Sequence, residues 1–419
     1  MPCGAGTGVG YHGLPNGSDV MTVTSAAPPV SQRGLGTALV LAAGTFAVGT
    51  DAFVVTGFLP AMANDLGVST AAAGQSLTVF AITYAILAPV LASVTSRVPR
   101  RTLLVAALLL LGLANVGTAL SPNLATLLIT RVLAAAGAAL YTPNAGSAAA
   151  MLVRPELRGR ALALVLTGLT VATAVGVPLG MVASQWLGWR LAIGLVAALA
   201  LLAALGVRAS MPQLPGTPAM PLRQRLKVLK LPSVRAILPL TWLGMAASYT
   251  PYVYSVGILR ELHMPEWSLP GLLFLYGAGA VIGISLSGWG TDRTTPTRVL
   301  AVAYGVMVLA LLGLTALSFA SAPSLVITAL CMLLWGASSW SQTPPQQHRL
   351  FSAAPEQAML LVALNAAGIY VGIGLGTFAG GLTMAYGAQA PLVVGSLLAL
   401  AALAFLGVTR RTLSTTSAP

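Results

Sequence analysis

Apolar segments long enough to cross a bilayer recur along this chain from residue 35 onward, and they restrict its possible folds more than any other feature. A hydrocarbon layer about 30 Å thick takes roughly 20 residues of helix. Twelve segments fit, with approximate limits 35–60, 72–95, 102–120, 124–146, 160–184, 190–207, 235–258, 268–290, 298–319, 323–343, 357–383 and 391–409. They lack the alternation of a membrane barrel, and lipid leaves bare backbone groups unsatisfied. The sequence therefore predicts an all-α integral membrane protein with twelve transmembrane helices.

Composition agrees with a membrane chain and argues against other classes. Hydrophobic residues make up 57% and charged residues 7%, whereas about a quarter of a soluble chain is charged. The net charge of +13 does not indicate nucleic-acid binding, because the basic residues fall singly or in small groups between apolar runs. We therefore expect no nucleic-acid partner. Cys3 and Cys331 form no metal-ligand spacing, so we also expect no metal.

Basic residues indicate how the chain is oriented in the membrane. If the N-terminus is cytoplasmic, 18 of the 21 Lys and Arg residues lie inside, Arg190 and Arg260 lie outside, and Arg131 falls within a helix. We therefore expect a multi-pass protein of the plasma (cell inner) membrane with both termini cytoplasmic. Residues 1–33 are predicted as a disordered cytoplasmic tail in which Met1 or Met21 is the start, and 410–419 as a second tail.

The chain divides into two similar halves. Residues 34–207 are predicted as an N-terminal six-helix bundle, 208–234 as a proline-containing cytoplasmic linker, and 235–409 as a C-terminal six-helix bundle. Arg97 and Arg293 each follow the second helix of a half and differ in number by 196 (293 − 97). Ladders of small residues repeat with the same offset, at Ala172, Gly176, Gly180 and Ser184 and again at Gly368, Gly372, Gly376 and Gly380. Two pseudo-symmetric bundles are typical of duplicated transporters.

One loop carries a family signature. The stretch "SGWGTDRTTPTR" contains Gly288, Asp292 and Arg293. It resembles the G-x-x-x-D-R-x-G-R-R loop of the major facilitator superfamily. The first-half copy, "LASVTSRVPRR", keeps Arg97 but has Ser96 in place of the aspartate.

Two further motifs lie on helices. "TVATAVGVPLGMVAS" resembles the antiporter signature G-x-x-x-G-P-x-x-G, with Gly176, Pro178 and Gly180 in place and Ala172 for the first glycine. "LLITRVLAAAGAA" is similar to the fourth-helix motif of the same superfamily and keeps Arg131. Over about residues 35–409 the chain resembles the drug:proton antiporters with twelve transmembrane helices, near exporters of chloramphenicol, sugars and nucleosides.

The resemblance implies the major facilitator fold and a set of roles. It implies conformational or leak control at Gly176, Pro178, Gly180, Gly288, Asp292, Arg293 and Arg97. Packing alone is the other explanation of the small-residue ladders, and it is favoured for residues 368–380. The resemblance further implies a monomer in the lipid bilayer, driven by the proton gradient with no cofactor.

Asp51 is a carboxylate within the first apolar segment, where a charge is costly unless it is paired, protonated or facing water. At 1.5 Å per residue, Asp51 lies about 13 Å below the outer end of its helix and Arg131 about 10 Å below the same surface. The matched depths predict that the two share a polar site. Burial favours the neutral acid and arginine favours the carboxylate, so this pair suits proton coupling. The alternatives are a static pair that joins two helices and an Arg131 that only anchors the fourth helix.

Cargo contacts are predicted at three residues among many polar and aromatic candidates. Tyr249 and Tyr252 are three positions apart on the seventh helix and share a face, whereas Tyr254 points elsewhere. Asn365 lies on the eleventh helix. An aromatic-lined cavity with few polar groups suits small amphipathic molecules better than ions.

The sequence thus predicts a proton-coupled transporter that exports a drug or antibiotic such as a chloramphenicol-like compound, an activity that would confer resistance. Export of a sugar, nucleoside or other metabolite is the first alternative, and proton-coupled import of a nutrient is the second. An enzyme or receptor is the third class. We find no nucleophile motif, no metal-spaced histidines and no G-x-x-x-x-G-K-[ST] loop, so catalysis and ATP drive are not expected.

Overall fold

The first half of the chain folds into helices joined by short loops. The computed structural model describes residues 33–216, 221–320, 323–354, 357–387 and 389–415. The first half contains α1 (Arg33–Phe53), α2 (Val55–Asp65), α3 (Thr70–Val94), α4 (Arg100–Ala119), α5 (Leu124–Met151), η1 (Pro155–Leu157), α6 (Arg158–Val171), the π turn η2 (Ala172–Gly176), α7 (Val177–Leu187) and α8 (Trp189–Ser210).

The second half repeats this architecture after a short connecting helix. It contains α9 (Leu222–Lys227), η3 (Val228–Lys230), α10 (Pro232–Tyr252), α11 (Ser255–Glu261), η4 (Glu266–Ser268), α12 (Leu269–Arg293), α13 (Pro296–Ala320), α14 (Leu325–Ser341), α15 (Thr343–Ala353), α16 (Ala358–Thr383), η6 (Met384–Tyr386) and α17 (Gln389–Thr415). No strand occurs in the described ranges, so the predicted all-α fold is confirmed.

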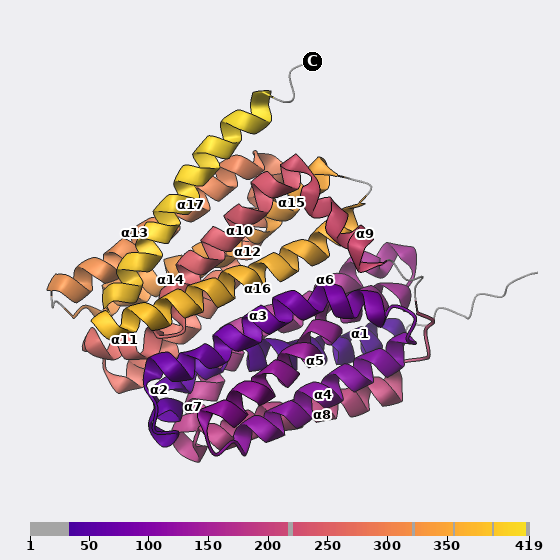
Figure 1. Cartoon of the computed structure of the whole chain (residues 1–419), viewed down its shortest axis with the longest axis horizontal. Helices are drawn as coiled ribbons and strands as arrows, with labels where there is room; N and C mark the ends of the chain where they lie inside the picture. The colour runs from indigo at the N-terminus through magenta and orange to yellow at the C-terminus, as the bar shows by residue number, and fades with distance from the viewer. Residues whose placement is uncertain (1–32, 217–220, 321–322, 355–356, 388, 416–419) are drawn as a thin grey trace, which may run out of the picture.

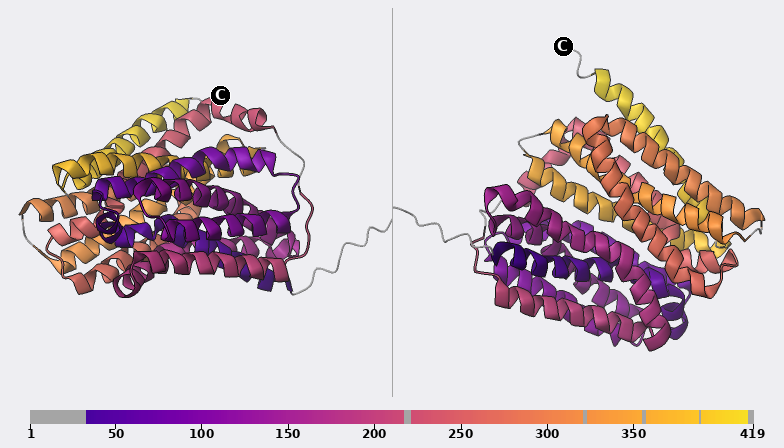
Figure 2. Two further views of the ribbon diagram at one scale, coloured as in Figure 1. Left: turned by 60° about the horizontal axis from the view of Figure 1, so that its bottom comes forward. Right: turned by 180° about the vertical axis from the view of Figure 1, so that it is seen from behind.

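The helices form two bundles that lie side by side (Figure 1). Helices α1 to α8 make one bundle and α10 to α17 the other, with α16 of the second running beside α3 of the first. The two further views keep the indigo-to-magenta and the orange-to-yellow helices apart (Figure 2). We call the helix ends near Arg100, Arg158 and Arg293 the basic end, and the ends near Asp65 and Glu266 the opposite end.

Eleven helices of the described chain are long and apolar enough to cross a membrane. The predicted segment 235–258 is not among them, although it is helical as α10 and α11. Its polar and aromatic residues lower its mean hydropathy, and most of them are buried inside the protein rather than facing lipid. A helix surrounded by other helices does not need a lipid-compatible surface.

Three of the predicted continuous helices are interrupted. The first breaks at Val54, and Phe58 beyond the break has non-helical φ and ψ angles of −131° and 17°. Pro60 contributes to this irregularity because it has no N–H for the helical ladder. The seventh breaks between Tyr252 and Ser255, directly after Pro251. The fifth contains the π turn directly before Val177 and Pro178.

Close contacts join the two bundles away from the basic end. A side chain added at Gly74 of α3 would overlap the ring of Tyr254, and one at Gly381 of α16 would overlap Gln75. At Gly277 of α12, an added Cβ would lie 2.6 Å from the carbonyl oxygen of Thr173 in the π turn. These three contacts lie in the halves of α3, α12 and α16 that face the opposite end.

Helix boundaries differ from the prediction at several places. The last helix continues to Thr415, so residues 410–415 of the predicted tail are helical. The predicted linker 208–234 contains α9 and η3, and the tenth segment extends through α15 to Ala353. Arg349, which falls between the predicted segments 323–343 and 357–383, consequently lies on a helix and is half-buried. The predicted disordered tail falls, except for Arg33, outside the described residues.

Candidate functional site

Asp51 and Arg131 form an ion pair inside the first bundle. Both side chains are 0% exposed. Arg131 Nη1 donates to Asp51 Oδ1 at 2.6 Å, and Arg131 Nη2 donates to the backbone oxygen of Asp51 at 3.1 Å. The helix break after Phe53 leaves the backbone oxygen of Asp51 available for the second bond, because carbonyl groups in the last turn of a helix lack partners within that helix. The pairing that the matched depths predicted is therefore present.

The pair retains unused hydrogen-bonding capacity. The Arg131 guanidinium lies 4.6 Å from the ring centroid of Phe80, within the range of a cation–π contact. Asp51 Oδ2 and Arg131 Nε have no hydrogen-bond partner among the described residues. A buried ion pair is strongly destabilised when it loses one partner, and this one has few supporting bonds to replace a partner. The second carboxylate oxygen of Asp51 therefore retains the capacity to accept a hydrogen bond.

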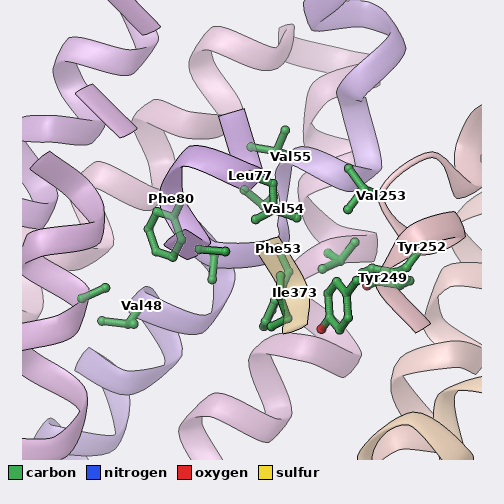
Figure 3. Packing of buried hydrophobic residues seen from close by; sticks show 14 of the residues in the cluster. Val48, Phe53, Val54, Val55, Leu77, Phe80, Tyr249, Tyr252, Val253 and Ile373 are labelled. Carbon is green, nitrogen blue, oxygen red and sulfur yellow. The ribbon is translucent and has the colours of Figure 1, made fainter. Parts of the chain in front are cut away.

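An aromatic cluster continues from Asp51 into the second bundle. We define it as Phe53, Tyr249, Tyr252, Tyr276, Trp335 and Trp340. Phe53 lies 5.7 Å from Tyr249 and 6.4 Å from Trp340, measured between ring centroids. Figure 3 shows the ring of Tyr249 beside Phe53, with Tyr252 next to Tyr249. The cluster thus begins two residues from the buried carboxylate and crosses between the bundles.

The rest of the cluster is built on the second bundle. Tyr252 stacks on Tyr276 at 4.2 Å and meets the edge of Trp335 at 6.0 Å. The hydroxyls of Tyr249 and Tyr252 and the indole N–H of Trp340 have no hydrogen-bond partner within the described chain. These buried polar atoms give the aromatic surface the capacity to hold a polar group of a ligand.

Ser248 anchors the cluster. Its hydroxyl accepts a hydrogen bond from Trp335 Nε1 at 3.0 Å, lies 3.2 Å from the hydroxyl of Tyr276 and contacts Ser339. All four residues are buried. One small side chain thus fixes two of the rings that surround Tyr252.

We expect Ser248→Ala to lower the free energy of unfolding by about 1–3 kcal/mol, because the buried indole N–H of Trp335 loses its acceptor. Unfolding of the detergent-solubilised protein by added dodecyl sulfate measures this change. Ser396→Ala is the matched control, since the buried hydroxyl of Ser396 donates only to the carbonyl of Leu392 one turn away. Equal losses in the two variants would contradict an anchoring role for Ser248.

A second aromatic contact joins the bundles near the ion pair. Tyr84 of α3 stacks on Tyr370 of α16 with centroids 3.8 Å apart, and Phe80 lies 6.3 Å from Tyr370. The sequence alone did not single out Tyr84, Tyr370, Phe53 or Phe80. Proximity to Asp51 was the available signal for Phe53, whereas nothing in the apolar sequence around Phe80 distinguished it.

Asn365 lies elsewhere than the other two predicted cargo residues. Its Oδ1 accepts a hydrogen bond from Thr241 Oγ1 at 3.0 Å. Thr241 and Tyr249 are both on α10, eight positions apart, which corresponds to about 12 Å along a helix. The predicted trio therefore occupies two separate places on the second bundle.

The small residues of the fifth helix pack against the helix of Asp51. A Cβ at Gly176 would lie 2.6 Å from Thr50 Oγ1, and one at Gly180 would overlap Val54. Pro178 is buried at the start of α7, directly after the π turn. The antiporter-like motif thus contacts Thr50, which directly precedes Asp51, and Val54, where the first helix breaks.

The loop motifs lie at the basic end of the helices, whereas the ion pair lies inside the first bundle. Gly288 and Asp292 line a cavity of about 210 Å³ together with Thr291, Pro344, Gln347, His348 and Phe351. The Arg293 guanidinium lies 4.6 Å from the ring centroid of Trp289, and Arg97 is exposed on the first bundle. This cavity contains none of the predicted cargo residues, so the buried charges and rings remain the stronger candidate site.

Known proteins resemble most of the chain. The family described as Major Facilitator Superfamily matches residues 41–360. "Uncharacterized MFS-type transporter YbcL" of Bacillus subtilis is 31% identical over 82% of this chain and 87% of its own length. "Chloramphenicol resistance protein" of Streptomyces lividans is 32% identical over 90% of this chain and 97% of its own length.

Solved structures share the fold at lower identity. A bacterial homolog of the human lysosomal transporter Spinster, in an inward-facing and unoccupied conformation, superimposes with a TM-score of 0.72 at 18% identity. The match covers 92% of this chain and 98% of that one. At this identity the likeness concerns the arrangement of the helices.

Proposed function

Because this chain belongs to the major facilitator superfamily and is a multi-pass membrane transporter, we propose that it exports a small amphipathic molecule in exchange for protons. The observation that carries the proposal is the buried ion pair between Asp51 and Arg131, which borders the aromatic cluster. A buried carboxylate with a free second oxygen is a group whose charge responds to access from either side of the membrane.

Coupling follows from competition for Asp51. When the site opens to the proton-rich side, a proton bound at the carboxylate neutralises Asp51 and weakens its bond to Arg131. When the site opens to the other side, the proton leaves and the pair re-forms at 2.6 Å. One proton moves inward for each such cycle, and cargo bound against the aromatic cluster moves outward. Rocking of the two bundles about the central site alternates the access.

The cargo is proposed to be a neutral, partly aromatic molecule. The described wall of Tyr249, Tyr252, Tyr276, Trp335 and Trp340 carries large apolar faces and no charge, and aromatic faces stack on planar ligands. The relative named chloramphenicol resistance protein favours chloramphenicol-like compounds as the first cargo to test.

Leak control is proposed for the motif of the fifth helix. Gly176 and Gly180 bring this helix against Thr50 and Val54, and the π turn lies where α12 of the other bundle makes its contact. Such close packing leaves little room for water beside Asp51. Gly288, Asp292, Arg293 and Arg97 are proposed to control the conformation at the basic end.

The basic end is proposed to face the cytoplasm, because positively charged residues accumulate on the inner side of membranes. Both termini would then be cytoplasmic, in a monomer of the plasma membrane. The proton gradient would supply the energy without a cofactor.

The proposal predicts proton release from energised inside-out vesicles on addition of chloramphenicol. Asp51→Asn should abolish this release, because the amide cannot take up and give back the proton. A lumenal fluorescent pH indicator provides the measurement. Arabinose and adenosine, tested in parallel, address the sugar and nucleoside alternatives.

Asp65→Asn is the matched control, since Asp65 is an exposed carboxylate of α2 that pairs with Arg190. It should release protons as the wild type does. Equal release by the wild type and Asp51→Asn would make Asp51 a structural residue. Loss of both protons and preloaded cargo from the lumen would indicate proton-coupled import.

A further inference from the structure

A chain of hydrogen bonds runs through the second bundle from Arg349 to Asn365. Arg349 Nη1 donates to Gln346 Oε1 at 2.9 Å, and Gln346 Nε2 donates to Thr241 Oγ1 at 3.0 Å. Thr241 Oγ1 in turn donates to Asn365 Oδ1 at 3.0 Å. Gln346, Thr241 and Asn365 are each no more than 1% exposed. The chain connects α15, α10 and α16 and is distinct from the aromatic cluster.

The direction of this chain is determined at its start. Arginine only donates hydrogen bonds, so the Gln346 atom that faces Arg349 must be the amide oxygen. The amide nitrogen of Gln346 also lies 3.1 Å from the carbonyl of Ile237, which only accepts. Gln346 therefore donates to Thr241, and the hydroxyl proton of Thr241 is left for Asn365.

Asn365 consequently presents its amide N–H group rather than its oxygen. Its Oδ1 is occupied by Thr241, and its Nδ2 has no hydrogen-bond partner among the described residues. A buried N–H group without a partner costs free energy, so its retention calls for a ligand.

A second donor lies close by. Trp242 Nε1 also lacks a partner in the described chain, and a Cβ at Gly368 would lie 3.0 Å from it. Asn365 and Gly368 are one turn apart on the same face of α16. An indole nitrogen only donates, so the two neighbouring groups both require an acceptor.

We propose that Asn365 and Trp242 form a donor pair that binds an acceptor oxygen of the cargo, such as that of a carbonyl or nitro group. Thr241, Gln346 and Arg349 are positioning residues that hold the Asn365 amide in its donating orientation. This inference rests on the proposed function for the identity of the cargo. It assigns the acceptor-bearing end of the cargo to the second bundle.

Asn365→Asp tests the assignment, because a carboxylate keeps the shape and the bond from Thr241 but places an acceptor where the donor was. The purified full-length protein is titrated with chloramphenicol and with its analogue in which an amino group replaces the nitro group. Binding is followed by the shift in thermal unfolding. We expect the variant to bind the nitro compound roughly tenfold more weakly relative to the amino compound than the wild type does.

Thr241→Val tests the positioning. We expect a several-fold weaker affinity for the nitro compound and little change for the amino compound, since the amide of Asn365 is no longer held. Thr250→Val on the same helix is the control, because the buried hydroxyl of Thr250 donates only to the carbonyl of Ala246.

An unchanged preference in Asn365→Asp would overturn the inference, as would a wild-type protein that binds neither compound. A Thr241→Val variant that lost affinity for both compounds equally would contradict the positioning role. Binding does not depend on proton movement, so a failure of the vesicle assay with the preference switch intact would refute the coupling proposal alone.

Discussion

Replacing Arg131 by methionine should lower the free energy of unfolding by about 3–5 kcal/mol, the cost of leaving one member of a buried ion pair without its partner. Asp51 would lose the bonds to both its carboxylate and its backbone oxygen. Methionine has a similar length and no charge, so the change removes the charge and hydrogen bonds with a small change in volume. Dodecyl sulfate titration of the purified protein, followed by circular dichroism, measures the loss.

The double variant Asp51→Asn with Arg131→Met separates stability from coupling. Removing both charges together is often nearly neutral for stability, so we expect most of the lost free energy to return. Substrate-driven proton release should remain absent, because the titratable group is gone. A single Arg131→Met variant as stable as the wild type would show that the pair does not hold α1 to α5.

Gly277→Ala should shift the equilibrium between conformations away from the one described above. An added methyl group at Gly277 would lie 2.6 Å from the carbonyl of Thr173 and would overlap the backbone of Ala174. Backbone atoms of a packed helix cannot rotate aside as a side chain does, so the bundles would have to separate at this point. Overpacking of this kind costs about 1–3 kcal/mol, enough to change a population ratio by roughly fivefold to a hundredfold.

Spin labels on Asn64 of α2 and Glu261 of α11 would report this separation. Both side chains are exposed at the opposite end, where the two helices approach each other. With Cys3 and Cys331 replaced, pulsed electron resonance gives the distance distribution between the labels. Gly277→Ala should favour longer distances, whereas Gly271→Ala, on the same helix with open space around it, should leave the distribution unchanged. Identical distributions in both variants would exclude Gly277 as a contact that limits opening.

The electrostatics of the site could be predicted because lipid penalises isolated charge. Asp51 and Arg131 interrupt apolar segments, and a rise of 1.5 Å per residue is sufficient to place both at one depth. The contact follows from depth and charge, since few other groups in hydrocarbon could satisfy either residue. The bond from Arg131 to the backbone oxygen of Asp51 could not be predicted, because it depends on the helix ending at Phe53.

The aromatic cluster was only partly predictable. Spacing on one helix placed Tyr249 and Tyr252 on one face, and the structure brings their rings to 5.2 Å. Spacing could not bring Phe53, Tyr276 and Trp335 to them, since these residues come from three other helices. It also could not separate Asn365 from the cluster, because its place depends on its partner Thr241.

The sequence alone determined the class of protein, the positions of the twelve helical segments and the gathering of basic residues at one end of the helices. It also determined that Asp51 and Arg131 need each other as partners. These properties follow from the cost of placing polar groups in hydrocarbon, which depends on residue type and position along the chain. Only the tertiary structure decided the helix breaks, the contacts of Gly277 and the direction of the hydrogen bonds that end at Asn365. In a membrane the lipid and the protein interior are equally apolar, so hydropathy does not mark which face of a helix meets its neighbours. Packing of small residues and directional hydrogen bonds select that face, and both exist only once the helices are assembled.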